Sequence, residues 1–464
     1  MILPLENLET RGGEPLYVRL YEAFREEIES GRVKKGEKLP SIRRLSEDSG
    51  LSRTTIEGAY QQLCVEGYIK SSPQRGYYVL DAARGSLSAP VAPPVQTADP
   101  SEERRVRYHL ESGRVDGSSM DLKRWRGYIK DVLGRQELLS SYGDSQGERE
   151  LREALAVYSH NVRGVQAGAE RFVIGAGTQP LLYLLCSLLR ERSNVVAMEA
   201  PGFKQAEQIF DDCGMRVYYL PSDEEGVRLD ALEASRAKAL FVNPSNRLKT
   251  GESIPMGRRL RLLEWAQKED ALLIEDDYNG ELRYNARPIP ALQGLTDGSR
   301  VVYLGSFSKL LLPSVRISYM VLTPRLLEKY LPQAERYNQT ASKIEQLALA
   351  RYVREGRLER HLRRLRKLYA AKSEKLMECL KSRFGEKIGI TLQETALCLV
   401  VSVSNGMSGA KLAASAEERG VRVTEMTETT DDGTPQARLG FAGLPFEDIE
   451  AAVGELAHAW LPET

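Results

Sequence analysis

From about residue 105 to residue 464, the sequence alternates short apolar runs with segments long enough to form helices. Continuous apolar runs of this length are typical of strands that are buried on both faces of a sheet. The runs are Arg171–Ile174, Val195–Met198, Ala239–Val242, Ala271–Glu275 and Val301–Leu304. Their alternation with helices predicts an α/β fold, with a mostly parallel sheet and helices on both faces. Ligands of such sheets bind beyond the carboxyl ends of the strands, so the residues that follow the runs are candidates for function.

The first 80 residues predict a small separate domain of helices followed by a hairpin. Leu16–Glu29 carries apolar residues at spacings of three and four, as an amphipathic helix does. Ser41 and Ser52 are each placed to cap a further helix, and Gly50 lies in the turn between these two helices. Two short strand-like runs on either side of residues 73–76 complete a winged helix-turn-helix.

A helix-turn-helix binds DNA with the first turn of its second helix, which enters the major groove. Hydroxyls and backbone N–H groups there can hold phosphate, and an arginine can bind guanine through two hydrogen bonds. The 65 Lys and Arg residues balance the 65 Asp and Glu residues, but Arg32–Arg53 holds seven basic and three acidic residues, so a local basic face is compatible with zero net charge. The candidates for DNA contact are Ser41, Arg43, Arg44, Ser52, Arg53, Thr54, Thr55, Arg75 and Gly76.

Residues 81–104 are rich in Ala, Pro and Ser and have little apolar periodicity, which predicts an extended, solvated linker between a domain at 1–80 and a body at 105–464. The longest strongly apolar stretch, Leu181–Leu189, is far shorter than the roughly 18 residues of a membrane span. The first residues lack the pattern of a secretory signal, and the five cysteines are scattered without metal-ligand spacing. We therefore expect a cytoplasmic protein that binds no membrane and no metal.

Lys309 is the strongest candidate for chemistry in the body. It follows the run Val301–Leu304, with Ser306 and Ser308 before it and Arg316 after it. A partly desolvated lysine near other cations has a lowered pKa, so its neutral amine can condense with an aldehyde. Serine hydroxyls and an arginine suit a dianionic phosphate. The pattern favours a Schiff-base lysine beside a phosphate, although this motif alone also fits a surface lysine after a strand.

Other candidates follow the remaining strand-like runs. Asp276 could keep a pyridine nitrogen protonated, which makes the ring an electron sink. Tyr278 and Asn246 are candidates to bind a ring hydroxyl, and Phe203 is a candidate to stack on the ring. Backbone N–H groups of a glycine turn before a helix could hold the phosphate. The residues of that turn are Gly177, Thr178 and Gln179. Each of these signals, taken alone, also fits an ordinary turn, helix cap or core residue.

In their order along the chain, these motifs resemble a fold-type I aminotransferase, and "KLPSIRRLSEDSGLSRTTIEGAYQQLCVEGYIKSSPQRGYYV" resembles the winged helix-turn-helix of the GntR family. Nearly the whole chain resembles the MocR (GabR-type) subfamily of GntR transcriptional regulators. The resemblance implies pyridoxal 5′-phosphate (PLP) as cofactor on Lys309, and operator double-stranded DNA as a partner of the first domain. It also implies that Arg438 binds the carboxylate of an effector. Finally, it implies a homodimer in which Tyr142 reaches the phosphate of the partner's site.

The expected function is that of a bacterial PLP-dependent transcriptional regulator. An amine or amino-acid effector would exchange with Lys309 in the aldimine and so change how the first domain fits its operator. Two alternatives stay open: PLP itself is the signal, as in control of vitamin B6 synthesis, or the body is an active aminotransferase. Gln205 stands where GabR-like sequences carry an arginine, so the effector of those proteins is not transferred to this chain.

Overall fold

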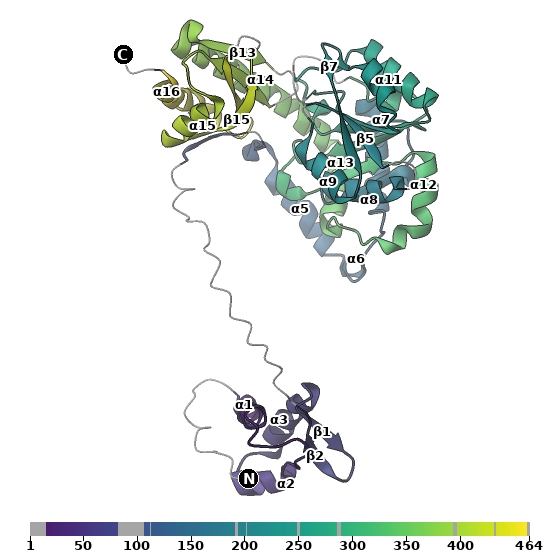
Figure 1. Ribbon diagram of the computed structural model, residues 1–464, viewed down its shortest axis with the longest axis vertical. Helices are drawn as coiled ribbons and strands as arrows, with labels where there is room; N and C mark the ends of the chain where they lie inside the picture. Colours follow the sequence, from purple (N-terminus) through teal and green to yellow (C-terminus); the bar gives the residue numbers. More distant parts are fainter. Residues whose placement is uncertain are drawn as a thin grey trace. The chain divides into compact units, whose positions relative to one another are not determined.

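The computed structural model describes residues 15–81, 106–111, 113–190, 194–200, 202–247, 251–284, 289–392, 397–430 and 433–461. Of the expected linker 81–104, all but Asp81 lies outside the described residues. The contacts divide the chain into two compact units, Met1–Ala98 and Asp99–Thr464 (Figure 1). We call the first unit the head and the second unit the body.

The head consists of three helices followed by a hairpin. Its elements are α1 (Leu16–Glu29), α2 (Ile42–Ser49), α3 (Arg53–Val65), β1 (Ile69–Ser72) and β2 (Gly76–Val79), with the two strands antiparallel. Apolar residues from all of these elements form one core, in which the ring of Phe24 in α1 lies edge-on to Tyr60 in α3 with centroids 5.4 Å apart. The expected winged helix-turn-helix is therefore confirmed.

Local capping explains why α2 and α3 begin where they do. The side chain of Ser41 accepts a hydrogen bond from the backbone N–H of Arg44, and Ser52 accepts one from Thr55. Both caps satisfy N–H groups that have no partner inside their own helix. Gly50 ends α2 with a φ of 69°, a left-handed conformation that glycine adopts at no steric cost.

The body is built on a seven-stranded sheet. In spatial order its strands are β4 (Phe172–Gly175), β12 (Ser318–Val321), β11 (Val301–Ser306), β10 (Leu272–Asp277), β9 (Ala239–Val242), β5 (Val195–Glu199) and β6 (Arg216–Leu220). Only β12 runs antiparallel to its neighbours, so the predicted mostly parallel sheet is confirmed. The five strand-like runs of the sequence coincide with β4, β5, β9, β10 and β11 to within two residues.

Helices cover both faces of this sheet, as its apolar strands require. In β10, Leu272 and Ile274 join a core with α8 (Thr178–Leu189) and α9 (Lys204–Asp212), whereas Leu273 joins a core with α11 (Met256–Lys268). The other helices before the long α14 are α5 (Leu122–Leu133), α6 (Gln136–Leu139), α7 (Arg149–Arg163), α10 (Leu229–Ser235), α12 (Pro324–Tyr330) and α13 (Lys343–Arg354). Strands β7 (Ser222–Asp223) and β8 (Gly226–Val227) form a small separate hairpin.

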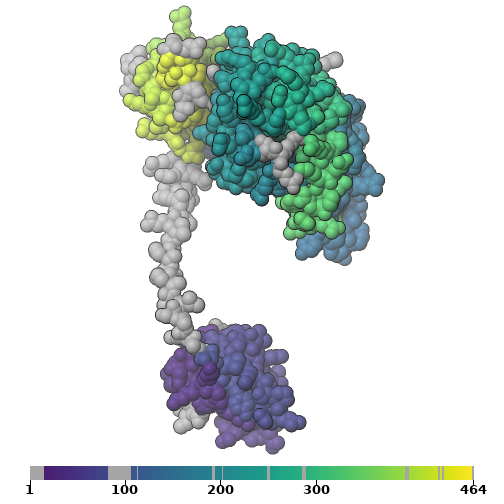
Figure 2. All heavy atoms as spheres, turned by 45° about the vertical axis from the view of Figure 1, so that its right-hand side comes forward, coloured from purple at the N-terminus to yellow at the C-terminus, as the bar shows by residue number. Residues whose placement is uncertain are grey.

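A smaller sheet near the C-terminus completes the body. Its order is β13 (Ile388–Leu392), β14 (Cys398–Val403), β16 (Pro435–Gly440), β15 (Val421–Thr429) and β3 (Tyr108–Leu110). The helices of this part are α14 (Arg357–Phe384), α15 (Gly409–Glu418) and α16 (Ile449–Trp460). In the space-filling view these C-terminal residues gather on one side of the body (Figure 2). Within the described part of the chain, no helix has both the length and the apolar character that crossing a membrane requires.

Candidate functional site

The candidate DNA-binding residues of the head cluster at the starts of α2 and α3. Ser52, Arg53 and Thr54 are exposed in the first turn of α3, and Arg53 forms no ion pair with any described residue. Arg43 pairs with Glu47 at 3.0 Å and Arg44 with Asp48 at 3.7 Å, all four side chains being exposed. Exposed pairs of this kind contribute little to stability. Phosphate groups can therefore replace the carboxylates as partners of these arginines.

The tip of the wing carries the other two candidates. Arg75 is exposed between β1 and β2, and Gly76 begins β2 with a φ of 99°. A methyl group at Gly76 would lie 3.1 Å from Cε of Lys38, so the small residue also keeps room for a neighbouring lysine. The wing therefore presents an exposed arginine on a tight turn, with Lys38 beside it.

In the body, one cavity of about 660 Å³ collects most of the residues that the sequence singled out. Its predicted lining residues are Gly177, Thr178, Gln179, Phe203, Asp276, Tyr278, Ser306, Ser308, Lys309 and Arg316. They follow β4, β5, β10 and β11, whose carboxyl ends lie at the same edge of the sheet because these strands run in one direction. The position agrees with the general rule for ligand sites in such sheets.

Lys309 lies partly buried in this cavity, three residues beyond the end of β11. Burial lowers the pKa of its amine to about 8, because the charged form loses hydration. Its Nζ forms no hydrogen bond or ion pair with the described residues. A substantial share of this amine is neutral near pH 7–8, as a nucleophile toward an aldehyde must be.

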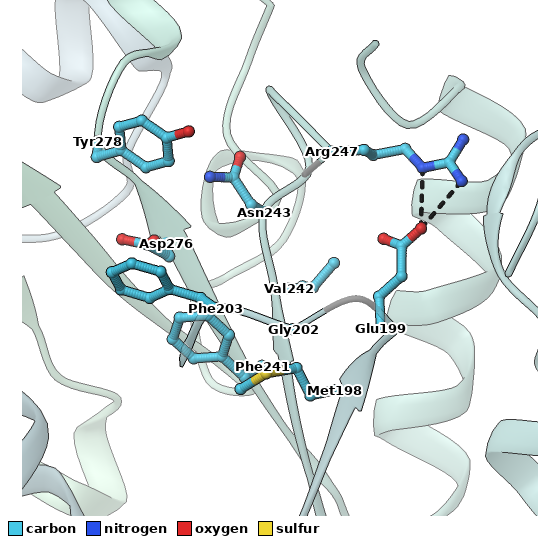
Figure 3. A pocket seen from close by; sticks show the side chains of 10 residues that line it. All are labelled: Met198, Glu199, Gly202, Phe203, Phe241, Val242, Asn243, Arg247, Asp276 and Tyr278. Carbon is cyan, nitrogen blue, oxygen red and sulfur yellow. Dashed lines mark hydrogen bonds and ion pairs between the residues drawn. The ribbon is translucent and has the colours of Figure 1, made fainter. Parts of the chain in front are cut away.

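Asp276 is 5% exposed at the end of β10, in the wall of the same cavity. Burial, and after it the negative charges of Asp277 and Glu275, raise the pKa of Asp276 to about 7. Asp277 pairs with Arg163 at 2.7 Å, but the Asp276 carboxylate has no hydrogen-bond partner among the described residues. Figure 3 shows it beside the ring of Phe203, which stacks on Phe241 with centroids 6.4 Å apart. A protonated ring nitrogen would supply the missing cation.

Tyr278 and Asn246 are joined by a hydrogen bond of 2.8 Å, in which the Asn246 amide donates to the Tyr278 hydroxyl. Asn246 is buried and is not among the residues that line the large cavity, so it meets the site only through Tyr278. Asn243, the first residue after β9, is a site residue that the sequence patterns did not predict. Its Oδ1 accepts from the backbone N–H of Asn246, while its buried Nδ2 has no partner in the described chain. Asn243 lines a smaller adjoining cavity together with Asp276 and Tyr278 (Figure 3).

The glycine turn before α8 and Arg316 form a cradle for an anion. Gly177 has a φ of 92° and a ψ of 177°, a conformation that is open essentially to glycine alone. A methyl group there would lie 2.6 Å from Nη2 of Arg316, which donates to the carbonyl of Ala176 at 3.2 Å. Thr178 begins a twelve-residue helix, whose free N–H groups favour phosphate. Ser306 and Ser308 line the same cavity.

Arg438 lies half-buried on β16, outside the residues that line the large cavity. Its Nε is buried without a hydrogen-bond partner in the described chain. Burial raises the pKa of the Cys398 thiol to about 11, and the positive charges of Arg438 and Lys309 both oppose this rise, so Cys398 lies within electrostatic reach of both cations. Tyr142, by contrast, is 99% exposed and does not line the cavity of its own chain.

The unsatisfied groups of this site match the functional groups of PLP one by one. A partly neutral lysine suits the aldehyde, and an unpartnered buried acid suits the pyridine nitrogen. The free amide nitrogen of Asn243 and the hydroxyl of Tyr278 suit the ring hydroxyl, and the cradle at Gly177 suits the phosphate. The donor set therefore fits the cofactor.

Comparison with known proteins finds a matching family for each of the two units. Residues 108–456 match the family model "Aminotransferase class I and II", and residues 16–79 match "Bacterial regulatory proteins, gntR family". The chain is 36% identical over 451 residues to the uncharacterized HTH-type transcriptional regulator YdeL of Bacillus subtilis, covering 96% of this chain and 97% of that protein. It is 30% identical over 465 residues to the probable rhizopine catabolism regulatory protein MocR of Rhizobium meliloti, covering 96% and 94% of the two chains.

Among solved structures, the kynurenine aminotransferase of Pyrococcus horikoshii matches with a TM-score of 0.66 and 25% identity. The match covers 80% of this chain and 96% of the aminotransferase. The fold and the family together indicate pyridoxal phosphate as the cofactor of the body. The chain therefore belongs to the aminotransferase class I and II family through its body and to the gntR family through its head, and is a transcriptional regulator of the MocR type.

Proposed function

We propose that the body of this regulator senses an amine or amino acid through Lys309, and that the head transmits the result to operator DNA. The observation that carries the proposal is the convergence of Lys309, Asp276 and the cradle at Gly177 in one cavity, at the carboxyl edge of the sheet. Residues of the same types, scattered over the surface, would not support a common ligand.

When bound, PLP supplies an aldehyde that condenses with amines and a ring that withdraws electrons. Lys309 provides the amine that holds the cofactor, and its lowered pKa keeps it ready both to attach and to leave. Asp276 holds a proton at the ring nitrogen, Tyr278 and Asn243 orient the ring hydroxyl, and Phe203 covers the ring. Gly177, Thr178, Gln179, Ser306, Ser308 and Arg316 hold the phosphate.

The amine of an effector would enter the position that Nζ of Lys309 holds, and Arg438 would bind the effector carboxylate. Arginine suits this task because its planar fork matches a carboxylate with two parallel hydrogen bonds. Gln205, which lines the cavity, offers a neutral amide toward the rest of the effector. Because only the effector-bound body makes these contacts, binding shifts the body between two arrangements, and the head follows.

We further propose that the regulator acts in the cytoplasm as a homodimer. Tyr142 supports the dimer because it is almost completely exposed on a loop whose neighbouring residues are held in place. Lys343 donates to Ser141 at 3.0 Å, and Arg152 pairs with Asp144 at 2.7 Å. A fixed loop that presents a bare aromatic side chain is suited to contact a second copy, where Tyr142 would reach the phosphate of the partner's site.

The deciding experiment compares the purified protein with Lys309→Ala in two assays. We expect Lys309→Ala to lose the visible absorbance of the lysine-bound cofactor and the response of operator binding to amines, while DNA binding itself is retained. Arg53→Ala is the reciprocal control, which should weaken operator binding and leave the absorbance unchanged. A Lys309→Ala variant whose operator binding still changed fully on addition of an amine would contradict the proposal.

The same assays separate the two alternative functions. If PLP is itself the signal, removal of PLP abolishes operator binding without any added amine. If the body is a working aminotransferase, an amino acid plus a keto acid gives steady product over many turnovers. A sensor gives neither result, and at most a single half-reaction follows addition of the amino acid.

A further inference from the structure

Lys372 is a fully buried charge that has no part in the cofactor cavity. It lies in the middle of the long helix α14 and is 1% exposed. A buried ammonium group is costly unless it is paired and hydrogen-bonded, so its partners indicate what the residue holds together. They belong to two loops, one that follows β3 and one that follows β16.

The first partner is Asp116, whose Oδ2 lies 2.6 Å from Nζ of Lys372. Asp116 belongs to the loop that follows β3, and Gly113 of the same loop lines the cavity of Lys309. A methyl group at Gly113 would lie 3.9 Å from Nζ of Lys309, so this loop passes directly beside the reactive amine. Tyr369, one turn before Lys372 in α14, accepts a further hydrogen bond from the backbone N–H of Asp116 at 3.4 Å.

The second partner is the backbone carbonyl of Ala442, 3.0 Å from the same Nζ. Ala442 follows β16, the strand that carries Arg438. The two loops also pack directly on each other, since a methyl group at Gly443 would lie 2.5 Å from Cβ of Arg114. One ammonium group therefore ties the loop beside Lys309 to the loop that continues from Arg438.

We propose that Lys372 is a positioning residue that sets the space between Gly113 and Arg438, and thereby the affinity of the body for ligands that carry a carboxylate next to their amine. The inference rests on the proposed function of Lys309 and Arg438, and it narrows the effector to amino acids rather than simple amines. Lys372 acts on the carboxylate end of the ligand, because Ala442, which it holds, follows the strand that carries Arg438.

The test uses two reagents that react with PLP in proteins whatever their effector. Aminooxyacetate carries a carboxylate, and methoxyamine has the same reactive group without one. The full-length protein is loaded with PLP, and the second-order rate constant of each reagent is measured from the loss of visible absorbance. The ratio of the two rate constants reports recognition of the carboxylate, while the methoxyamine rate alone reports access to the cofactor.

In Lys372→Met we expect the ratio to fall about tenfold, with the methoxyamine rate and the initial spectrum unchanged. Asp116→Asn should lower the ratio in the same direction. The double variant Asp116→Asn/Lys372→Met leaves no unpaired charge in the interior, so it should regain thermal stability without regaining the ratio. A single variant that fails to fold therefore does not end the test.

Arg438→Ala separates failure of this inference from failure of the proposed function. If Arg438→Ala collapses the ratio but the Lys372 and double variants keep the wild-type ratio, Lys372 is only a structural residue and the inference is wrong. If Arg438→Ala itself leaves the ratio unchanged, Arg438 does not bind the carboxylate. The proposed role of Arg438 and the positioning role of Lys372 then fail together.

Discussion

At the scale of single residues, Asp276 is a buried carboxyl group whose pKa lies far from its ordinary value. Its carboxyl pKa is raised from 3.8 to about 7, chiefly by burial and then by the charges of Asp277 and Glu275. The folded apo-protein therefore retains a proton that the unfolded chain releases between about pH 4 and pH 7. Because the native state binds more protons in this range, stability falls as pH rises through it.

We predict that Asp276→Asn makes the apo-protein more stable than wild type at pH 8, by a few kcal/mol, but not at pH 4. The measurement is urea denaturation of both apo-proteins at the two pH values. With PLP bound, the ring nitrogen partners the carboxylate, so the advantage of the variant should disappear and its affinity for PLP should be lower. An equal effect of the substitution at both pH values would show that Asp276 is ionised in the apo-protein.

The residues of the site differ in how far the sequence could identify them. Lys309 and Asp276 follow apolar runs at positions where chemistry in α/β sheets gathers, so pattern and resemblance found them together. Asn243 was missed because its free Nδ2 depends on which way an amide turns inside a fold, which no spacing encodes. Lys372 was not among the predicted residues, since the loops that contact it come from residues 116 and 442, far away in sequence.

At the scale of elements, the glycine turn at Gly177 and helix α8 form one functional unit, because the turn places the N-terminus of the helix in the wall of the cavity. The sequence predicted the strand, the turn and the helix correctly, since periodicity and glycine are local signals. The predicted runs did not include β6 or β12. The antiparallel direction of β12 depends on how the chain returns to the sheet and not on composition. The positive φ of Gly177 likewise required coordinates.

We predict that Gly177→Ala weakens the binding of PLP more than tenfold but changes the binding of pyridoxal, which lacks the phosphate, much less. The added methyl group meets Arg316 at 2.6 Å and forces a conformation that alanine avoids, so the cradle must open. Fluorescence or absorbance titration of the apo-protein with both compounds gives the two affinities.

Gly257→Ala is the matched control for this substitution. Gly257 lies in the first turn of α11 with no atom within 4 Å of an added methyl group, so alanine should fit without strain and leave both affinities unchanged. If Gly177→Ala reduced PLP and pyridoxal binding equally, the turn would hold the ring or the wall of the cavity rather than the phosphate.

At the scale of the whole molecule, the head and the body each have an apolar core of their own. Helix-rich heads and large α/β bodies bury very different amounts of surface, so they are expected to unfold with different enthalpies. A ligand that binds only one folded unit stabilises only that unit, by about 2.7 kcal/mol at a concentration of one hundred times its Kd. PLP therefore provides a way to label the unfolding of the body.

We predict two calorimetric unfolding transitions, a larger one for the body and a smaller one for the head. PLP should raise the midpoint temperature of the larger transition only, and operator DNA that of the smaller transition only. Leu63→Ala, which removes a fully buried side chain from the core of the head, should lower the smaller transition alone, because it leaves a cavity worth about 2–5 kcal/mol. In Lys309→Ala, PLP should raise the midpoint temperature of the larger transition by less than in wild type, while the effect of DNA on the smaller transition stays the same. A single transition that both ligands move would instead show that the two units unfold together, and coupling between effector and operator would then need no separate signal between head and body.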